Sequence, residues 1–303
     1  MRRRTWILGS ALGVGALAVA GSGEALSRPA LCDVGPPPAD LPVERVSMRT
    51  SSNGTVAGWF VPGQAGRGAV LLLHGVRSNR LAMVTRARFL LRLGFATLLI
   101  DLPAHGESPA PHMTYGANEA LGVRAALAFL AARLPGERIG AVGVSLGAAS
   151  LVLARPDPAP SAVVLESMFP TIEEAVADRL ALHLGAFAAP LAPLLLWQVP
   201  LRLGISTAQL HPIDALPQLK TPVFILAGSA DRHTTLAESR RLYAAANDPK
   251  TLWILDGAAH VDLHAFAPAA YEARVGAFLA RHLAGDRIDA ATVAALDDGR
   301  RHA

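Results

Sequence analysis

The chain has few cysteines, few aromatic residues and a small net charge, and each of these scarcities argues against a class of structure or function. Its single cysteine, Cys32, rules out an intramolecular disulfide and a cysteine-based metal site. Aromatic residues make up only 5% of the 303 residues, so the core must be built mainly from Leu, Val and Ala. The basic residues are nearly all arginines scattered along the chain, and the net charge is only +4. Without a basic stripe interleaved with aromatics, the sequence argues against nucleic-acid binding.

The N-terminus has the pattern of a targeting segment. Met1–Arg4 contains three arginines, and residues 6–23 then carry no charge. A basic start followed by an apolar run is typical of an export signal, with a small-x-small cleavage site at Ala18–Ala20. An uncleaved membrane anchor is the alternative, because the run approaches the roughly 20 residues that span a bilayer. We therefore expect an exported (periplasmic or extracellular) or membrane-anchored protein, with residues 1–30 outside the fold and a linker over 31–41.

A single large α/β domain is predicted over residues 42–284, where apolar runs alternate with helical patterns. The first two strands are expected to be antiparallel, and the nearly continuous apolar character of the later runs indicates strands covered on both faces. The alternation predicts the α/β class, with a doubly wound, mostly parallel sheet of about eight strands and helices on both faces. The expected strands are Val43–Val46, Val56–Val61, Ala69–Leu73, Ala96–Ile100, Ile139–Val142, Ala162–Leu165, Val223–Ala227 and Thr251–Leu255, and the expected helices are Arg80–Leu93, Ala117–Leu134, Leu146–Leu153 and Thr235–Ala246.

One insertion interrupts this alternation, at about residues 170–215. Within it, Ala181–Ile205 has Arg202 as its only fixed charge, which suggests a membrane span, but three prolines argue against one. We expect a small helical cap packed over the site. Residues 285–303 are polar and are expected to form a C-terminal tail.

The most informative motif is Gly143-Val144-Ser145-Leu146-Gly147, directly after a predicted strand. A strand that meets Gly-x-Ser-x-Gly and turns into a helix raises the serine onto a sharp bend, and a Cβ at either glycine would collide with a neighbouring element. The hydroxyl of Ser145 would then lie at the N-terminus of a helix, which suits a nucleophile whose reaction builds negative charge.

A serine nucleophile needs a base, and the sequence offers one with a carboxylate partner. Asp231 and His260 each follow a predicted strand, where groups of an α/β site are expected. An imidazole can take the serine proton, while a carboxylate fixes its tautomer. The chain also offers nearby rivals, of which His264 is the best alternative base and Asp256 more plausibly supports the histidine loop. The rivals are His233, His264, Asp256 and Asp262.

Two further motifs follow strand ends. In His74-Gly75-Val76, the glycine lets the backbone bend so that the Val76 N–H points into the site, where it forms an oxyanion hole with the Leu146 N–H. We assign His74 no proton transfer. The second motif, Asp101–Ser108, is interpreted as a turn with capping polar groups rather than as catalytic.

Taken together, these motifs resemble the α/β-hydrolases of the serine aminopeptidase/lysophospholipase-like branch. The resemblance runs from about Val43 to Leu283 and implies Ser145 as nucleophile, Asp231 as acid, His260 as base, and Val76 and Leu146 as backbone oxyanion donors. Ala259 departs from the pattern, because the family often has Gly before the histidine. A serine at the elbow also argues against the branches with an aspartate nucleophile.

The expected function is hydrolysis of a carboxylic ester through an acyl-enzyme, with no cofactor and no metal. The partner is a small-molecule ester or a peptide-like substrate, and membrane association through the N-terminus or the apolar cap stays open. An apolar cap with Leu, Phe and Trp197 favours a hydrophobic acyl group. One alternative is an aminopeptidase or amidase on the same triad. A peptidase that acts at free amino termini needs a carboxylate for the substrate ammonium, and Glu166, Glu173 and Glu174 are candidates. Another is a non-catalytic binding protein on the same scaffold.

Overall fold

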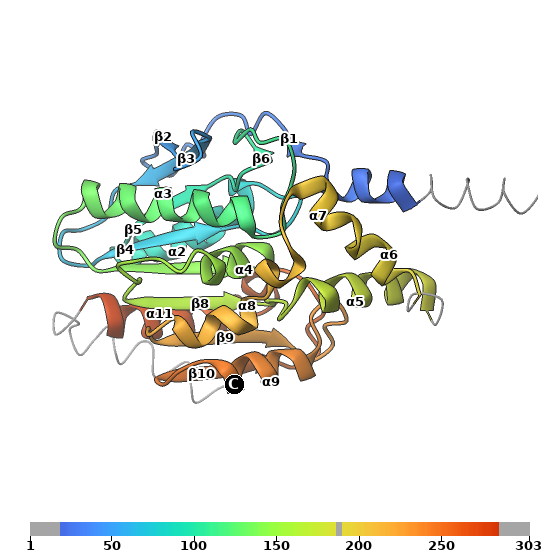
Figure 1. Ribbon diagram of the computed structural model, residues 1–303. Helices are drawn as coiled ribbons and strands as arrows, with labels where there is room; N and C mark the ends of the chain where they lie inside the picture. The colour runs from blue at the N-terminus through green and yellow to red at the C-terminus, as the bar shows by residue number, and fades with distance from the viewer. Residues whose placement is uncertain (1–18, 186–189, 285–303) are drawn as a thin grey trace, which may run out of the picture.

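The computed structural model describes residues 19–185 and 190–284. The expected polar tail over 285–303 and most of the apolar run near the N-terminus lie outside the described residues. The rest forms an eight-stranded sheet with helices on both faces and a helical cap at one end (Figure 1). The predicted α/β-hydrolase fold is therefore confirmed.

The sheet has the order β10-β9-β8-β7-β4-β5-β3-β2. β3 pairs antiparallel with both β2 and β5, and the other neighbours pair in parallel. Every strand expected from the sequence is present, with ends that shift by a few residues. The strands are β2 (Glu44–Arg49), β3 (Thr55–Val61), β4 (Ala69–Leu73), β5 (Ala96–Ile100), β7 (Ile139–Val144), β8 (Ala162–Glu166), β9 (Val223–Gly228) and β10 (Lys250–Leu255).

Two apolar clusters, one on each face, hold the helices to the sheet. On one face, alternate residues of the central strands pack against α3 (Ala117–Arg133), α4 (Leu146–Leu153) and α9 (Leu236–Ala245). On the other, the intervening residues pack against α2 (Val84–Arg92) and α11 (Pro268–Leu283). Burial on both faces explains why these strands are apolar throughout.

One expected helix begins differently from the prediction. The pattern over Arg80–Leu93 opens with a 3₁₀ turn, η1 (Arg80–Met83), before α2. Asn79 accepts a hydrogen bond from the Leu81 N–H at 3.0 Å, and the Arg80 N–H donates to Asp101 at 2.8 Å. The Asn79 and Asp101 side chains accept hydrogen bonds from N–H groups of the first turn and so fix its geometry.

The insertion after β8 forms the expected cap. It contains α5 (Ile172–Leu184), α6 (Ala192–Leu196) and α7 (Gln198–Leu203). The chain then returns to the sheet through η3 (Thr207–Leu210), α8 (Pro212–Ala215) and η4 (Leu216–Gln218). Figure 1 shows α5, α6 and α7 at one end of the molecule, next to the N-terminal helix.

The N-terminal segment differs from the expectation that residues 1–30 lie outside the fold. Residues 19–27 are helical, and β1 (Ala30–Leu31) pairs in parallel with β6 (His105–Gly106). Residues 19–31 therefore pack against the hydrolase domain. Whether the leader is cleaved or anchors the protein stays a prediction. Within the described ranges, no helix combines the length and apolar character needed to cross a membrane.

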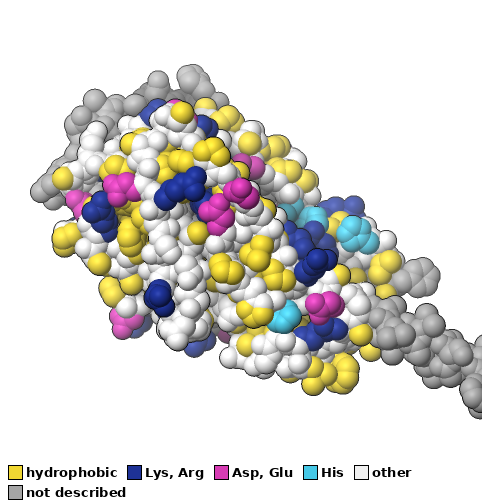
Figure 2. Space-filling model, turned by 90° about the horizontal axis from the view of Figure 1, so that it is seen from above, with side chains coloured by type: hydrophobic (Ala, Val, Ile, Leu, Met, Phe, Trp, Pro, Cys, Tyr) yellow, Lys and Arg dark blue, Asp and Glu magenta, His cyan; other side chains and the backbone are white. Residues whose placement is uncertain are grey.

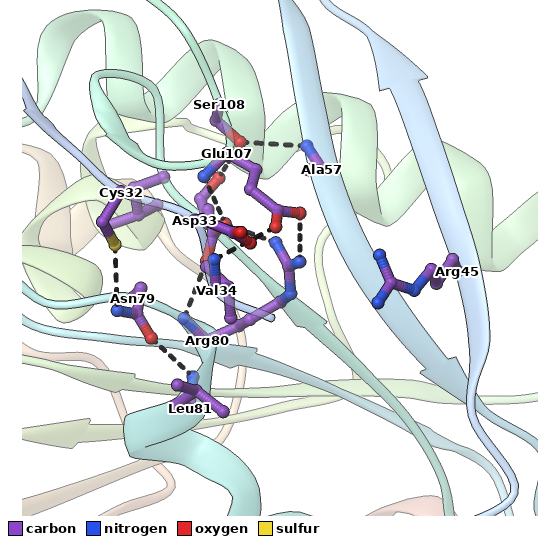
Figure 3. Close-up of polar contacts among 12 residues, drawn as sticks. Cys32, Asp33, Val34, Arg45, Ala57, Asn79, Arg80, Leu81, Glu107 and Ser108 are labelled. Atoms are coloured by element: carbon purple, nitrogen blue, oxygen red, sulfur yellow. Dashed lines mark hydrogen bonds and ion pairs between the residues drawn. The ribbon is translucent and has the colours of Figure 1, made fainter. Parts of the chain in front are cut away.

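A buried ionic network fastens the segment that follows. Arg80, which is 1% exposed, contacts the carboxylates of Asp101 and Glu107, and Glu107 accepts the Val34 N–H at 3.1 Å (Figure 3). Asp101 also accepts the Glu107 N–H at 2.7 Å. The expected linker over 31–41 is thereby tied to the turn after β5.

The face seen in Figure 2 carries basic and acidic side chains interspersed with apolar ones. The described residues on this face form no continuous basic field of the kind that tracks a nucleic-acid backbone.

Candidate active site

Ser145 lies on the bend between β7 and α4. Its backbone has φ +50° and ψ −109°, a conformation that non-glycine residues rarely adopt. Its N–H donates to the carbonyl of Glu166 on the neighbouring strand at 2.8 Å, and its carbonyl accepts the Ala149 N–H at 3.0 Å. Strand and helix together hold the strained serine in place, as expected for a functional bend.

The two glycines of the motif are required by close packing. A Cβ on Gly143 would lie 2.6 Å from the backbone nitrogen of Ala148, and one on Gly147 would lie 2.5 Å from the carbonyl oxygen of Leu73. Both distances are much shorter than a normal van der Waals contact. The collision predicted from the sequence is thus present at both positions.

Asp231 and His260 form a hydrogen-bonded pair. His260 Nδ1 lies 2.8 Å from Asp231 Oδ2, and the carboxylate is buried while the ring is partly exposed. Thr234 holds the carboxylate through its hydroxyl at 2.9 Å and its N–H at 3.0 Å. Burial acts to raise the pKa of Asp231, but the hydrogen bond and charge of His260 hold it below its ordinary value. The sequence analysis missed Thr234, which its position three residues after an aspartate could have indicated.

Ser145 lies at the same edge of the sheet, at the end of β7, two strands away from the strand that precedes Asp231. Within residues 19–185 and 190–284, no hydrogen bond joins the Ser145 hydroxyl to the ring of His260. Hydrogen bonds between a nucleophile and its base are often long in a free enzyme and shorten with substrate. The structure thus joins Asp231 with His260 and places Ser145 at the same edge of the sheet.

The two predicted oxyanion donors belong to segments that adjoin this serine. Leu146 is the first residue of α4. The N–H groups of the first turn of a helix have no carbonyl acceptor within that helix. Gly75 faces the serine so closely that a Cβ there would lie 3.8 Å from Ser145 Cβ. The N–H of the next residue, Val76, donates to no acceptor in the described part of the chain. Both donors are therefore available to a ligand.

His74 is buried and fixes the peptide that follows it. Its Nε2 accepts the Leu102 N–H at 3.0 Å, so its proton is on Nδ1, which donates to the Gly75 carbonyl at 2.7 Å. Because the N–H and C=O of a trans peptide point in opposite directions, this bond also orients the Val76 N–H. Burial lowers the pKa of His74 to about 3, so the ring is neutral and takes a positional role.

The rival groups have other partners. His264 is buried against Thr85 and Glu272, each at 3.2 Å, away from Asp231. Asp256 accepts a hydrogen bond from Ser229 at 2.9 Å, and Ser229 in turn accepts the Gly257 N–H at 2.8 Å. Asp256 thus supports the loop that leads to His260.

His233 lies beside His260, with 4.9 Å between the ring centroids. Burial and the charge of Arg179 lower its pKa. His233 is thus a neighbour of the predicted base, but it is His260 that pairs with Asp231.

The motif Asp101–Ser108 forms a buried structural turn. Asp101 is held by Arg80, and Ser108 donates to the Asp101 carbonyl at 2.7 Å and accepts the Ala57 N–H at 2.9 Å (Figure 3). Burial raises the pKa of the Asp101 carboxyl, although the N–H groups of Glu107 and Arg80 and the charge of Arg80 act to lower it. These contacts agree with its interpretation as a capped turn.

The three carboxylates considered for an ammonium group are all paired. Glu166 is buried against Arg86, Glu173 contacts His211 at 2.7 Å, and Glu174 contacts Arg241. None of the three candidates for holding a substrate ammonium is therefore unpaired.

One sequence expectation about the cap is wrong. Trp197 was expected to line an apolar pocket, but its side chain is 71% exposed at the junction of α6 and α7. Leucines, not the tryptophan, face the interior of the cap.

The fold and the serine bend define an α/β protein of the hydrolase class. A family model described as "Alpha/beta hydrolase family" matches residues 70–274, and the chain belongs to this family. The Mycobacterium tuberculosis protein Rv2307c, described as uncharacterized, is 31% identical over 230 residues, covering 73% of this chain and 74% of that protein. YqkD of Bacillus subtilis, also described as uncharacterized, is 24% identical over 209 residues, 68% of each chain.

Solved structures show the same fold. The esterase Pf2001 of Pyrococcus furiosus is 25% identical, with a TM-score of 0.70 over 85% of this chain and 100% of that chain. The esterase RhEst1 of a Rhodococcus species matches with a TM-score of 0.58 at 17% identity, over 78% of this chain and 99% of that chain. The family and the likeness to Pf2001 support hydrolase activity, whereas RhEst1 shows the fold alone.

Proposed function

We propose that this protein is a serine hydrolase that cleaves carboxylic esters, with a hydrophobic acyl group, through an acyl-enzyme on Ser145. The observation that carries the proposal is the His260–Asp231 pair, with 2.8 Å between Nδ1 and Oδ2, at the edge of the sheet where Ser145 stands on its strained bend. Carboxylate, imidazole and serine are the three components of a proton relay, and they occur here in the order Ser, Asp, His.

In the proposed reaction, His260 Nε2 takes the proton of Ser145 as its oxygen attacks the ester carbonyl. The Asp231 carboxylate stabilises the imidazolium through Nδ1–H. The N–H groups of Val76 and Leu146 stabilise the negative oxygen of the tetrahedral intermediate. The alcohol then leaves with the proton from His260. The same ring next takes a proton from a water, whose oxygen attacks the acyl carbon, and it returns that proton to the Ser145 oxygen as the acid is released.

Two alternatives remain to be separated from this proposal. An aminopeptidase on the same groups has less support because its candidate ammonium ligands, Glu166, Glu173 and Glu174, are already paired. A non-catalytic binding protein would not explain a strained serine beside two unoccupied N–H donors.

The test compares p-nitrophenyl octanoate with octanoyl p-nitroanilide, using the wild type and Ser145→Ala. We expect ester turnover that Ser145→Ala reduces at least 10³-fold, and slower turnover of the anilide. Faster hydrolysis of the anilide would favour the amidase. Equal ester turnover by both proteins would contradict the proposal.

A further inference from the structure

The loop after β9 wraps around the Asp231 carboxylate and fixes the residue beside the predicted base. The N–H of His233 donates to Asp231 Oδ1 at 2.8 Å, and the N–H of Thr234 donates to the same oxygen at 3.0 Å. The other oxygen, Oδ2, lies 2.8 Å from His260 Nδ1. One carboxylate therefore sets the position of both the His233 backbone and the His260 ring.

The rings of His233 and His260 lie against each other. Their centroids are 4.9 Å apart, and their planes are tilted by 41°. Aromatic pairs are favourable at centroid separations of roughly 4.5–7 Å. Within the described ranges, the His260 side chain is hydrogen-bonded through Nδ1 alone. A ring held at one atom can still turn about that bond, so a neighbouring ring restricts the directions in which Nε2 can point.

The His233 side chain acts through its face and not through its nitrogens. In the part of the chain that the structure describes, its Nδ1 is buried without a hydrogen-bond partner. A buried polar atom without a partner costs free energy, so hydrogen bonding does not explain why this ring is placed here. Its planar face, in contact with the predicted base, does explain it.

The surroundings of His233 keep its ring uncharged at neutral pH. Burial lowers the pKa of the ring, and the charge of Arg179 on α5 acts in the same direction. Positive charge on His260 or His183 would lower the pKa further, whereas the Asp231 carboxylate acts to raise it. An uncharged His233 adds no second positive charge beside the imidazolium that the proposed reaction forms.

From these contacts we infer that His233 is a positioning residue: its uncharged ring holds the His260 imidazole in the orientation that directs Nε2 toward the Ser145 hydroxyl. The inference rests on the proposed function and adds a fourth side chain, one that acts through the base. Loss of an interaction that assists only the chemical step lowers kcat and leaves KM nearly unchanged. Loss of the ring at position 233 should have this effect.

The test separates the ring from its nitrogens. His233→Gln keeps a polar side chain but has no ring, and it is expected to lower kcat for p-nitrophenyl octanoate roughly fivefold, with KM within twofold of wild type. His233→Phe keeps a ring without nitrogens and should recover at least half of the wild-type kcat. The control is Arg232→Gln, a change at the exposed neighbouring residue, which should leave kcat unaltered. Equal kcat values in His233→Gln and His233→Phe would overturn the inference.

A second ringless variant serves if His233→Gln does not fold. His233→Leu fills the space without a ring or a polar atom, and it should show the same fivefold loss in kcat. A kcat equal to that of His233→Phe would contradict the inference. Failure of the inference is distinct from failure of the proposed function. Equal kcat values in the Leu and Phe variants, together with loss of activity in Ser145→Ala, would reject the role of His233 alone, whereas ester turnover that survives in Ser145→Ala would reject the function.

Discussion

Arg86 and Glu166 form a buried ion pair beneath the site, with 2.7 Å between Nη2 and Oε2. The carbonyl of Glu166 accepts the N–H of Ser145, and the same guanidinium reaches Asp262 at 2.7 Å, two residues beyond His260. Tyr271 contacts both members of the pair. One arginine thus links the serine bend with the histidine loop.

Glu166→Gln should destabilise the protein, because it leaves the buried Arg86 charge with only the partly exposed Asp262. Removing one partner of a buried pair costs about 3–5 kcal/mol in free energy of unfolding. Urea unfolding followed by circular dichroism measures this. Glu44→Gln breaks an exposed pair with Arg133 and should cost less than about 1 kcal/mol. A similar cost for both variants would contradict the role of the buried pair.

Asp262→Asn should lower kcat about tenfold with little change in KM, because the histidine loop loses its charged contact with Arg86. Asparagine is also a good N-cap, so the short helix α10 (Leu263–Phe266), which Asp262 caps, should be retained. Steady-state kinetics on p-nitrophenyl octanoate test this. The control is Asp40→Asn, which breaks an exposed pair with Arg88 on the same helix as Arg86. Equal kcat values in both variants would count against the link.

Asp231→Asn should reduce kcat roughly 10³- to 10⁴-fold while the protein stays folded. The change removes the carboxylate that fixes the tautomer of His260 and stabilises its imidazolium. The matched control is Asp256→Asn, a neighbouring carboxylate that contacts Ser229 instead of the histidine, and we expect it to lose less than tenfold. A loss of less than tenfold in Asp231→Asn would rule out the assigned acid.

The buried His74 should make the protein less stable in mild acid. In the native state it stays neutral down to a pKa of about 3, whereas in the unfolded chain it titrates near 6.5. Between these values the unfolded state binds more protons, so stability falls as pH falls from 6.5 toward 3. At pH 5 the cost is about 2 kcal/mol. In His74→Asn the loss of stability between pH 7 and pH 5 should be smaller by that amount. An unchanged pH dependence would contradict the neutral, buried ring.

The strands could be predicted from the sequence, and the three candidate catalytic groups proposed from it, because each has a local signal. Apolar runs such as Ala69–Leu73 mark strands buried on both faces, and Gly143–Gly147 marks the bend. The contacts of Arg86 have no local signal, since its partners lie 80 and 176 residues away. Likewise, nothing in the run over residues 6–23 indicates that its end is helical and contacts Gln198 and Arg202 of the cap.

The central claim is that Ser145 is a nucleophile activated by His260. The most direct measurement is intact-protein and peptide mass spectrometry after treatment with a fluorophosphonate. We expect a single adduct on the peptide containing Ser145, no adduct in Ser145→Ala, and labelling at least 10²-fold slower in His260→Ala. An adduct at another residue, or equally fast labelling of Ser145→Ala, would contradict the account.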